Sequence, residues 1–528
     1  MKSSSLVFLL TLSLMAGVAP VRAQDSARDG LVLANVGTKE ITRRELTARL
    51  LEYRGDEALD KMIGRVLLQQ EAKRLNLTVT DEELDLKMRE IQTRFQAESA
   101  FRNFLKSSHL TENQLREETR STLLLQKVAL HNDPIKDEDL EQFDIRMIVA
   151  ADKATAEKWI KDLEKTDFIE MAAKSSVDPK LRQARGKMAP FIRIEMLGVS
   201  KAIDDGKLKL GEYTKTPIAL DNGKWGIVRL ERRLPVEVST SPAERDRLVA
   251  MVTAYRTDQW MTQARGKAKI ARMGTDKDPV ATVNGQAISR AQLTHRLLEF
   301  YGEEALQQMA NREILLQAAR AQNSSVSDEE ADRLFKEIRQ KFGSDGDFQT
   351  FLTRSFLTEK QLRDEVRYNT LMERVALKES PVTDTDLQQY EIRMLTVANP
   401  AKGDEFVKRL NDGEDFGKLA SFFSLNPDGR VAGGRMRPFL KIDMLDVCRA
   451  MDEQGLKPGS YTKKTVLLTD NTYVLIKLEN IIPASTLAPN EKERLRKRVV
   501  DYRIGQWLSQ ARGRTKVDYP VPLEAVLK

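Results

Sequence analysis

The sequence predicts an α+β protein of two tandem modules, each a helical domain interrupted by an inserted α+β domain with a four-stranded antiparallel sheet. Three observations support this prediction. The second half of the chain repeats the first, helix-start signals recur through the first hundred or so residues of each half, and strand-like runs follow them. Charged residues make up 31% and hydrophobic residues 41% of the 528 residues, a balance typical of helix-rich globular domains.

The N-terminus has the pattern of a cleavable secretory signal. Lys2 precedes an apolar run over residues 6–18, and small residues follow up to Ala23. The run is too short for a membrane span, and no later stretch is apolar enough for one. We therefore expect a signal peptide at residues 1–23 and a periplasmic or secreted protein after cleavage near Ala23. The single cysteine, Cys448, excludes an intramolecular disulfide.

The charge distribution argues against one class of partner, nucleic acid, but does not identify the partner that the protein binds. A net charge of +7 arises from 86 basic and 79 acidic residues, without a long basic block. This pattern indicates a mixed solvated surface and argues against a nucleic-acid partner. A mild attraction to anionic clients or membrane surfaces stays open.

The repeat has one dominant register. Residues 36–46 lie over residues 283–293, an offset of 247 (283 minus 36), and this register continues without a gap to Arg146, which matches Arg393. One insertion shifts the offset to 248, and it returns to 247 near the end, where Trp260 matches Trp507. Each copy of roughly 240 residues is long enough to fold as its own body.

After a short strand at residues 31–36, the first copy shows helix starts of one type, and the second copy repeats them. An apolar residue precedes a Ser or Thr cap, and a Glu or Gln follows three residues later, which is the hydrophobic staple with a capping box. These signals predict a bundle of about four helices in each copy. The six cap pairs are Thr42–Glu45, Thr80–Glu83, Thr111–Gln114, Ser289–Gln292, Ser327–Glu330 and Thr358–Gln361.

The middle of each copy changes character. In the first copy a β-type run at residues 143–149 precedes helical patterns, and strands at 216–220 and 225–230 flank a hairpin turn at Asp221-Asn222-Gly223. The order β-α-α-β-α-β-β predicts a compact domain with an antiparallel sheet. A long helix then starts at Ser241-Pro242, and a short strand at 268–271 follows it.

These residues resemble the SurA/PrsA family of extracytoplasmic foldases. The opening Val283-Asn-Gly-x-x-Ile288-Ser-Arg, the helical bundle, a parvulin-type middle and the returning helix occur in the family's order, twice. Within the middle, Gly433-Gly434-x-Met436 resembles the family's glycine signature. The resemblance covers residues about 34–273 and 281–519, and implies that the N-terminal helices and the last helix form one chaperone domain.

The resemblance gives the expected domain boundaries. They are 1–23 signal peptide; 34–142 helical chaperone domain, 143–236 parvulin-like domain and 237–278 long helix and strand of copy one; and 279–389 helical chaperone domain, 390–484 parvulin-like domain and 485–528 helix and tail of copy two.

In parvulins the resemblance implies two histidines and an Asp or Cys around the twisting X-Pro amide, whose rotation barrier is roughly 18–20 kcal/mol. This chain lacks the histidines: its three, His109, His131 and His295, lie outside both parvulin-like segments. We expect no catalytic residue and a vestigial pocket in each copy. The pocket positions are Met147, Asp178, Met196 and Gly226 in copy one and Met394, Asn426, Met444 and Val474 in copy two, with Ser200 and Cys448 where the family has Phe.

Several of these residues have a simpler interpretation as core. Met147 and Met394 fit either an adaptable client cradle or an ordinary core, and the core is favoured. Trp260 and Trp507 fit either an exposed client-binding stripe or the buried face of a helix, and the buried face is favoured. Cys448 has no catalytic partner nearby in the sequence and is expected to be a buried, inert thiol.

No Ser-His-Asp set, phosphate-binding loop or metal-ligand cluster occurs, so we expect no cofactor and no metal, and binding rather than catalysis. The favoured function is an ATP-independent chaperone whose partners are unfolded or partly folded exported polypeptides. One alternative is a divergent peptidyl-prolyl cis-trans isomerase. The other is a scaffold protein that binds one dedicated partner or forms a homodimer.

Overall fold

The computed structural model describes residues 29–95, 97–108, 110–131, 133–220, 222–236 and 241–527. The expected signal peptide and Asp221 of the expected hairpin turn lie outside these residues. The described chain forms two compact units. The first unit spans Arg54–Tyr301, and the second combines residues 29–53 with residues 302–527. Both boundaries fall within long helices, α1 (Arg43–Arg74) and α12 (Arg290–Ala321).

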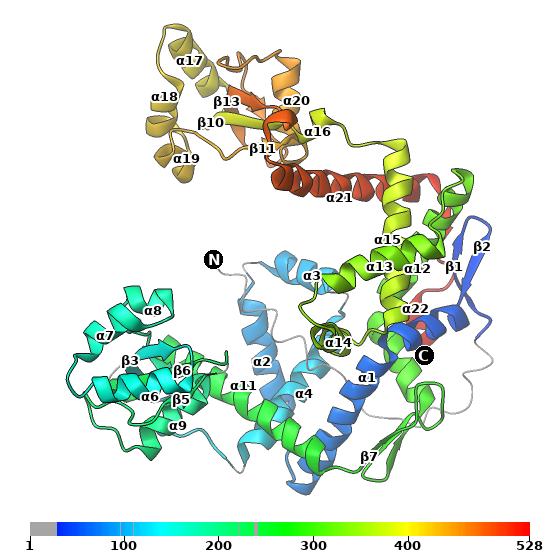
Figure 1. The fold of residues 1–528 in the computed structure, drawn as a ribbon. Coiled ribbons are helices and arrows are strands. Elements are labelled where there is room, and N and C mark those ends of the chain that lie inside the picture. Colours follow the sequence, from blue (N-terminus) through cyan, green and yellow to red (C-terminus); the bar gives the residue numbers. More distant parts are fainter. Residues whose placement is uncertain are drawn as a thin grey trace. The chain divides into compact units, whose positions relative to one another are not determined.

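The first unit contains a helical part in which the last long helix of the first copy returns to the earlier ones (Figure 1). Leu68 of α1 and Leu125 and Val128 of α4 form a buried cluster, against which Trp260 of α11 packs. The expected buried face at Trp260 is thus a half-buried contact with its own unit. The helices are the C-terminal part of α1, α2 (Asp81–Thr93), α3 (Glu98–Ser107), α4 (Glu112–His131) and α11 (Pro242–Lys267).

The sheet domain of the first unit has four antiparallel strands in the order β4-β3-β6-β5. Its central strands, β3 and β6, pair along their length, with Met147 opposite Val228 and Val149 opposite Gly226. α9 packs against one face of the sheet, and α6 and α7 pack against the other. The elements are α5 (Asp137–Leu140), β3 (Gln142–Ala150), α6 (Lys153–Asp162), α7 (Phe168–Ser175), α8 (Pro179–Gln183), β4 (Phe191–Ile192), η3 (Arg193–Glu195), α9 (Leu197–Asp205), β5 (Ile218–Ala219) and β6 (Trp225–Leu234).

The second unit repeats this order of elements. Its sheet runs β11-β10-β13-β12, again antiparallel, and its last long helix, α21, packs on α15 and α16 of the same unit. Trp507 of α21 is buried and donates its indole N–H to Glu379 at 3.2 Å. The elements after α12 are α13 (Asp328–Gln340), α14 (Asp345–Arg354), α15 (Glu359–Glu379), α16 (Asp384–Leu387), β10 (Gln389–Val397), α17 (Pro400–Asn411), α18 (Phe416–Phe423), α19 (Pro427–Val431), β11 (Phe439–Leu440), η4 (Lys441–Asp443), α20 (Leu445–Glu453), β12 (Val466–Leu467), β13 (Tyr473–Ile482), η5 (Ala484–Thr486), α21 (Pro489–Arg514), β14 (Val517–Asp518) and α22 (Leu523–Leu527).

These elements confirm the predicted fold class, which is mixed helix and sheet with antiparallel sheets. Four helices follow the first strand in each copy, and the strands expected at 143–149 and 225–230 are β3 and β6. Among the described residues, no helix is both long enough and apolar enough to cross a membrane.

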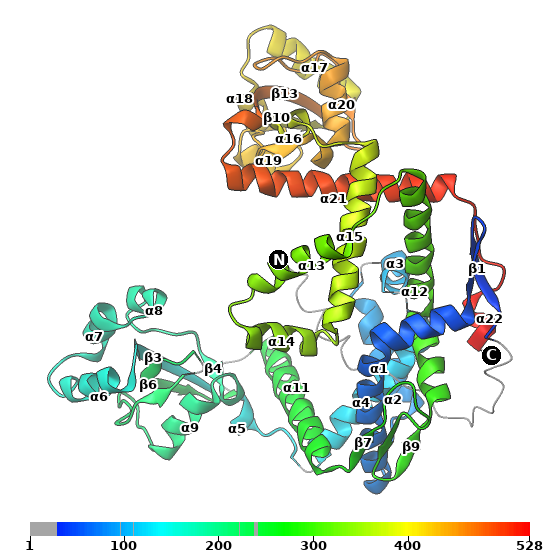
Figure 2. The same ribbon diagram turned by 45° about the vertical axis from the view of Figure 1, so that its right-hand side comes forward.

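The two sequence copies exchange their N-terminal hairpins, so that each hairpin lies in the unit formed mainly by the other copy. In the second unit the last strand, β14, pairs with β1 (Val32–Val36), which in turn pairs with β2 (Lys39–Thr42). In the first unit β7 (Ile270–Arg272) pairs with β8 (Ala281–Val283), which pairs with β9 (Gln286–Ile288). Figure 2 shows β1 beside the C-terminal segment and β9 near β7. Each unit is therefore completed by a hairpin from the other sequence copy.

Two glutamines hold these hairpins at equivalent places. The Gln70 amide donates to the carbonyl of Val283 at 3.2 Å in the first unit. The Gln317 amide donates to the carbonyl of Val36 at 3.0 Å in the second unit. Both pairs obey the sequence offset of 247, since 317 minus 70 and 283 minus 36 give the same value. The same backbone carbonyl is thus satisfied by the same side chain in both units.

All six predicted helix caps are present. In five of them the cap hydroxyl accepts a backbone N–H while the Glu or Gln side chain accepts the N–H of the cap residue, and at Ser327 the hydroxyl contact to Glu330 is 3.2 Å. Two of the cap glutamines make a further contact. Gln114 donates its amide to the carbonyl of Glu299 at 2.8 Å, and Gln361 donates to the carbonyl of Glu52. A glutamate at either place would preserve the cap but has no proton to donate.

The hairpin exchange predicts the behaviour of a cut chain. A site for a sequence-specific protease inserted after Asp276, in the loop between β7 and β8, divides the chain at the junction of its two copies. We expect the fragments to co-elute in size-exclusion chromatography after cleavage, because each contributes a hairpin to the other's unit. They should separate in urea. Separate elution under native conditions would show that the hairpins close on their own copies.

The double role of the cap glutamines predicts the effect of a conservative change. Gln114→Glu keeps the capping box but removes the side-chain donor to the carbonyl of Glu299 and places a carboxylate at a position that is 9% exposed. The free energy of unfolding should fall by about 1–3 kcal/mol, because the buried carboxylate faces a carbonyl oxygen to which it cannot donate. Glu83→Gln, at an exposed cap, is the matched control and should change stability far less. Urea denaturation measures both, and equal effects would contradict the proposed role of the second hydrogen bond.

Candidate functional site

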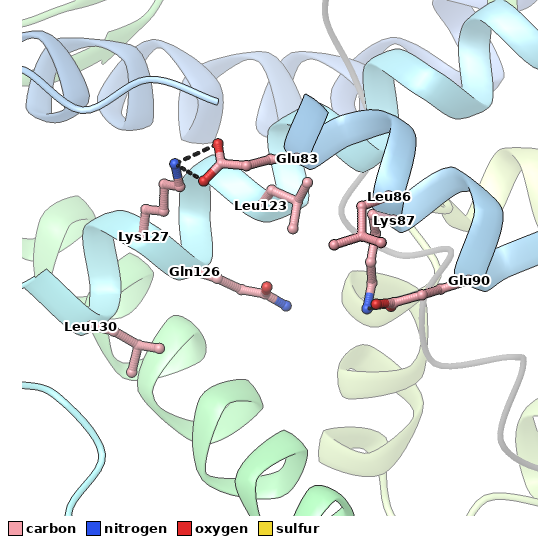
Figure 3. Close-up of a pocket in the computed structure, with 8 residues that line it drawn as sticks. All are labelled: Glu83, Leu86, Lys87, Glu90, Leu123, Gln126, Lys127 and Leu130. Atoms are coloured by element: carbon pink, nitrogen blue, oxygen red, sulfur yellow. Dashed lines mark hydrogen bonds and ion pairs between the residues drawn. The ribbon is translucent and has the colours of Figure 1, made fainter. Parts of the chain in front are cut away.

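A hollow in the first unit lies between α2 and α4 (Figure 3). Three leucines give the hollow an apolar lining. One of them, Leu86, is 55% exposed to solvent although its side chain is entirely apolar. The volume of about 520 Å³ is in the range of sites that bind peptide side chains or small molecules. We call it the α2–α4 groove; it is lined by Glu83, Leu86, Lys87, Glu90, Leu123, Gln126, Lys127 and Leu130.

The charges around the α2–α4 groove neutralise one another. Glu83 and Lys127 form an ion pair at 2.6 Å across the two helices, and Lys87 pairs with Glu90 at 2.7 Å. Hydrogen bonds from Lys127 and the Thr80 backbone hold the pKa of Glu83 below its ordinary value. With its charged neighbours paired, the groove favours a neutral apolar ligand rather than an ion.

The second copy keeps one of the two ion pairs and changes the apolar lining. The position of Lys87 carries Leu334, so the Lys87–Glu90 pair is not repeated. Arg374 pairs with Glu330 at 2.6 Å, as Lys127 does with Glu83. The positions of Leu86 and Leu123, however, carry Arg333 and Thr370 in the second copy. The same helix pair thus forms with either lining, which means that the leucines are not required by the fold.

The expected isomerase pocket of the first copy is filled by its own side chains. Met147, at a histidine position, is buried with 4% exposure in the cluster that includes Phe191 and Val199. A Cβ at Gly226, the second histidine position, would lie 3.1 Å from the Met147 sulfur. Met196 is half-buried against the same cluster. The favoured interpretation of Met147 as core is therefore confirmed.

The position where the family has a pocket phenylalanine is also closed. Ser200 is 3% exposed, and its hydroxyl lies within 3.0–3.2 Å of the carbonyl oxygens of Arg193, Met196 and Leu197. The hydroxyl can donate to only one carbonyl at a time, so its hydrogen-bonding capacity is used inside the domain.

Asp178 and Asn426 occupy equivalent places and do the same structural task. Asp178 caps α8, where its carboxylate accepts the backbone N–H groups of Lys180 and Leu181 at 2.8 and 3.0 Å. Asn426 caps α19 through the backbone N–H of Gly429 at 3.1 Å. Both residue types are good N-caps, which explains why the position tolerates either.

In the second copy the pocket positions are likewise part of a core. Val474 is fully buried, and Met394 and Met444 are half-buried against the same cluster. Cys448 is 1% exposed, and burial raises the pKa of its thiol to about 12. The thiolate is the reactive form, so this cysteine is inert at neutral pH, as the sequence predicts.

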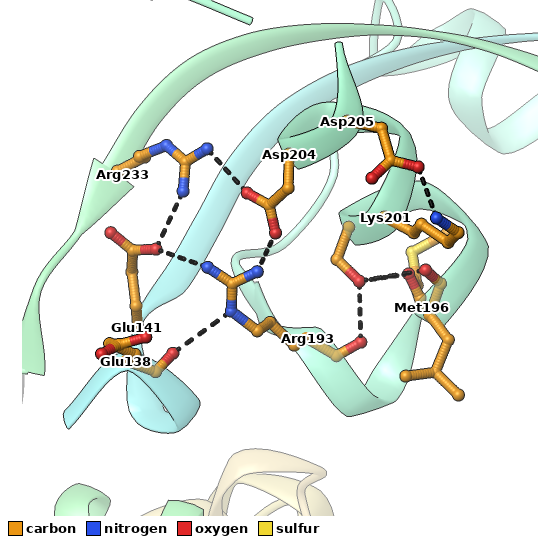
Figure 4. A network of polar contacts seen from close by, with 10 residues as sticks. Glu138, Glu141, Arg193, Met196, Lys201, Asp204, Asp205 and Arg233 are labelled. Atoms are coloured by element: carbon orange, nitrogen blue, oxygen red, sulfur yellow. Dashed lines mark hydrogen bonds and ion pairs between the residues drawn. The ribbon is translucent and has the colours of Figure 1, made fainter. Parts of the chain in front are cut away.

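A network of four charged side chains beside the first pocket was not predicted (Figure 4). Arg233 contacts Glu141 at 3.0 Å and Asp204 at 2.9 Å, while Arg193 contacts the same two carboxylates. Both guanidinium groups lie 5.1 Å from the Phe143 ring. The network fastens α9 to the edge of the sheet, and its charges are mutually neutralised rather than available for proton transfer.

The second copy retains one pair of this network. Lys441 contacts Asp452 at 2.7 Å, while the positions of Glu141 and Arg233 carry Gln388 and Ile481. No sequence signal marks the network in copy one, because its members come from four separate elements and none belongs to a motif.

The remaining candidates do not assemble into a site. His131 is exposed and His295 half-buried, and His109 lies outside the described residues. Within the described parts of the chain, no group of three or more His, Cys, Asp or Glu side chains is arranged to hold a metal ion.

Comparisons with known proteins find similarity over the first helical part of the chain. Residues 53–129, which contain α2 and α4, match the model of the SurA-like N-terminal domain. Foldase protein PrsA 2 of Listeria monocytogenes is 29% identical over 178 residues, which cover 32% of this chain and 58% of the Listeria protein. This chain therefore spans little more than half of that relative.

Two further similarities extend over larger shares of the related protein. The putative peptidyl-prolyl cis-trans isomerase YacD of Bacillus subtilis is 22% identical over 244 residues, 43% of this chain and 80% of YacD. The crystal structure of the peptidylprolyl isomerase PrsA from Bacillus cereus covers 44% of this chain and 89% of that chain, with 26% identity and a TM-score of 0.29. The chain is similar to foldases of the SurA/PrsA type, and residues 53–129 are similar to the SurA-like N-terminal domain.

The filled pocket predicts the outcome of restoring a histidine. Gly226→His places a ring where Met147 and Leu220 already lie, at 3.1 and 3.3 Å from the first added carbon. The free energy of unfolding should fall by about 1–3 kcal/mol, as in other overpacked cores. Met394→His, at a half-buried position, is the control and should cost less. A Gly226→His variant as stable as the parent, with proline isomerase activity, would contradict a closed pocket.

Proposed function

We propose that this protein is an ATP-independent chaperone that binds unfolded or partly folded exported polypeptides. The α2–α4 groove carries the proposal: Leu86 is exposed and Leu123 half-buried, the second copy folds without either leucine, and the charges around the groove are paired. Similarity to a SurA-like domain over the same residues supports it. We further propose that the chain acts in the periplasm or after secretion, following removal of residues 1–23, and that it arose by duplication of one chaperone module.

The parvulin-like domains are proposed to be vestigial as isomerases. Met147, Gly226, Met394 and Val474 stand where histidines are expected, and Asp178 and Asn426 serve as helix caps. Met196 and Met444 then act as core contacts rather than as the floor of a proline pocket. The divergent-isomerase alternative remains worth testing because YacD is named a putative isomerase.

The groove can be tested by giving it the residues of the second copy. Leu86→Arg with Leu123→Thr should weaken client binding by about tenfold or more, since burying even one leucine contributes about 1.5–3 kcal/mol and about 1.4 kcal/mol corresponds to tenfold. The measurement is suppression of aggregation of a chemically unfolded outer-membrane protein at increasing chaperone concentration. Leu210→Arg, which removes a 64% exposed leucine elsewhere, is the control and should leave suppression unchanged.

The same samples separate the alternatives. A chaperone without isomerase activity leaves the slow, proline-limited refolding phase of a test protein unchanged, at tens of seconds. Acceleration of that phase would favour the isomerase. A scaffold for one dedicated partner would show neither effect, and one protein would dominate a pull-down.

A further inference from the structure

The second sheet domain exposes an unusual group of apolar side chains at the ends of α18 and α19. Phe422 is 74% exposed, Phe423 43%, Leu425 56% and Val431 92%. We call these four residues the α18–α19 patch. Side chains of this kind are normally buried, so a group of them within ten residues requires an explanation.

The first copy shows that the fold does not need the patch. At the offset of 248, the positions of Phe422, Phe423 and Val431 carry Lys174, Ser175 and Gln183. Lys174 is exposed and pairs with Glu170 at 2.6 Å. The apolar residues of the second copy are thus an addition to a domain that folds with polar ones.

The backbone beneath the patch is held in the same way in both copies. The Leu425 N–H donates to the carbonyl of Thr396 at 3.0 Å, and Ser424 accepts the Thr396 N–H at 3.2 Å. In the first copy Val177 donates to the carbonyl of Val149 at 2.8 Å in the equivalent contact. The patch therefore sits on a fixed platform, which lowers the entropic cost of binding.

A hollow of about 390 Å³ adjoins the patch and shares Phe423 and Leu425 with it. Phe406 forms another wall, with its ring centroid 5.4 Å from that of Phe423. The hollow is lined by residues of α17 and α18, whose cores pack on one face of the sheet, whereas Met394 and Val474 pack with α20 residues on the other face. Figure 1 shows α17 and α18 beside β10 and β13 in this domain. The hollow is thus separate from the former isomerase pocket.

The charges beside the hollow are already satisfied. Lys402 pairs with Glu405 at 2.7 Å. Arg409, 4.6 Å from the Phe423 ring, makes two contacts of 2.7 Å with Glu414. With these two cations paired, the hollow itself, which is lined by Phe406, Phe423 and Leu425, favours a neutral apolar ligand.

From these observations we infer that the α18–α19 patch and its hollow bind bulky apolar side chains of an extended, non-native polypeptide. A second folded copy is a poorer occupant, because a stable interface takes about 20–30 residues a side and the patch has four. The inference rests on the proposed chaperone function and adds a second contact surface, on a different domain, to the α2–α4 groove.

The test uses the full mature chain and a fluorescein-labelled 12-residue peptide of alternating Phe, Leu and Gly, followed by fluorescence anisotropy. Phe422→Lys with Val431→Gln transfers the residues of the first copy to the two most exposed positions. In the background of the groove variant, Leu86→Arg with Leu123→Thr, these changes should weaken the remaining peptide binding by about tenfold or more. Unchanged thermal unfolding verifies that the variant is folded.

The matched gain-of-binding variant is Lys174→Phe with Gln183→Val, which builds the patch on the first copy and should strengthen binding. A photo-reactive benzoylphenylalanine at position 422 should crosslink to the peptide, and one at the exposed position of Glu157 on the first sheet domain should not.

Two results would overturn the inference alone. In the first, peptide binding depends on the groove but not on Phe422 and Val431. In the second, the patch variant binds the peptide normally and changes only the sedimentation of the protein, which would indicate self-association, or its flotation with phosphatidylglycerol vesicles, which would indicate membrane binding. Absence of peptide binding to the parent protein would overturn the chaperone proposal as well.

Discussion

The backbone pairing of β1 with β14, and of β7 with β8, is the constraint on which both units depend. A two-stranded hairpin is marginal by itself, and a third strand with a buried face makes it stable. Leu33, Ala34 and Val36 are fully buried in the second unit, as are Ala281 and Val283 in the first. The long helices α1 and α12 begin directly after these hairpins, so the strand pairing also fixes where each helix starts.

The two copies have the same order of helices and strands, but their exposed apolar residues lie at different places. Copy one has the leucine-lined groove, where copy two carries Arg333 and Thr370. Copy two has the α18–α19 patch, where copy one carries Lys174, Ser175 and Gln183. A polypeptide held at two such surfaces gains apparent affinity without any strong single contact, because the second binding event is intramolecular. Weak contacts would also release a client readily, which suits the ATP-independent function that we propose.

Much of the fold could be predicted from local sequence patterns. Contacts between residues that are distant in the sequence could not be predicted. A cap such as Thr80–Glu83 depends on only four consecutive residues, so the local sequence predicts it. The strands β3 and β6 have apolar runs that are typical of a buried sheet. The hairpin exchange was missed because its strands have only two to five residues, and nothing in Val36 indicates that its partner is Val517. The Arg193–Asp204 network was missed for the same reason. The cap glutamines held the one available clue, since Gln114 and Gln361 are amides in both copies where a carboxylate would serve the cap.

The pairing of Val36 with Val517 has a consequence for the order in which the protein matures. The first hairpin to leave the ribosome waits for nearly the last strand, 481 residues later (517 minus 36). Contacts of such sequence separation form slowly, since the chain must close a very long loop first. The second unit is therefore complete only after the chain has been made as far as β14. If the chain is exported as we propose, such late closure would favour transport before folding.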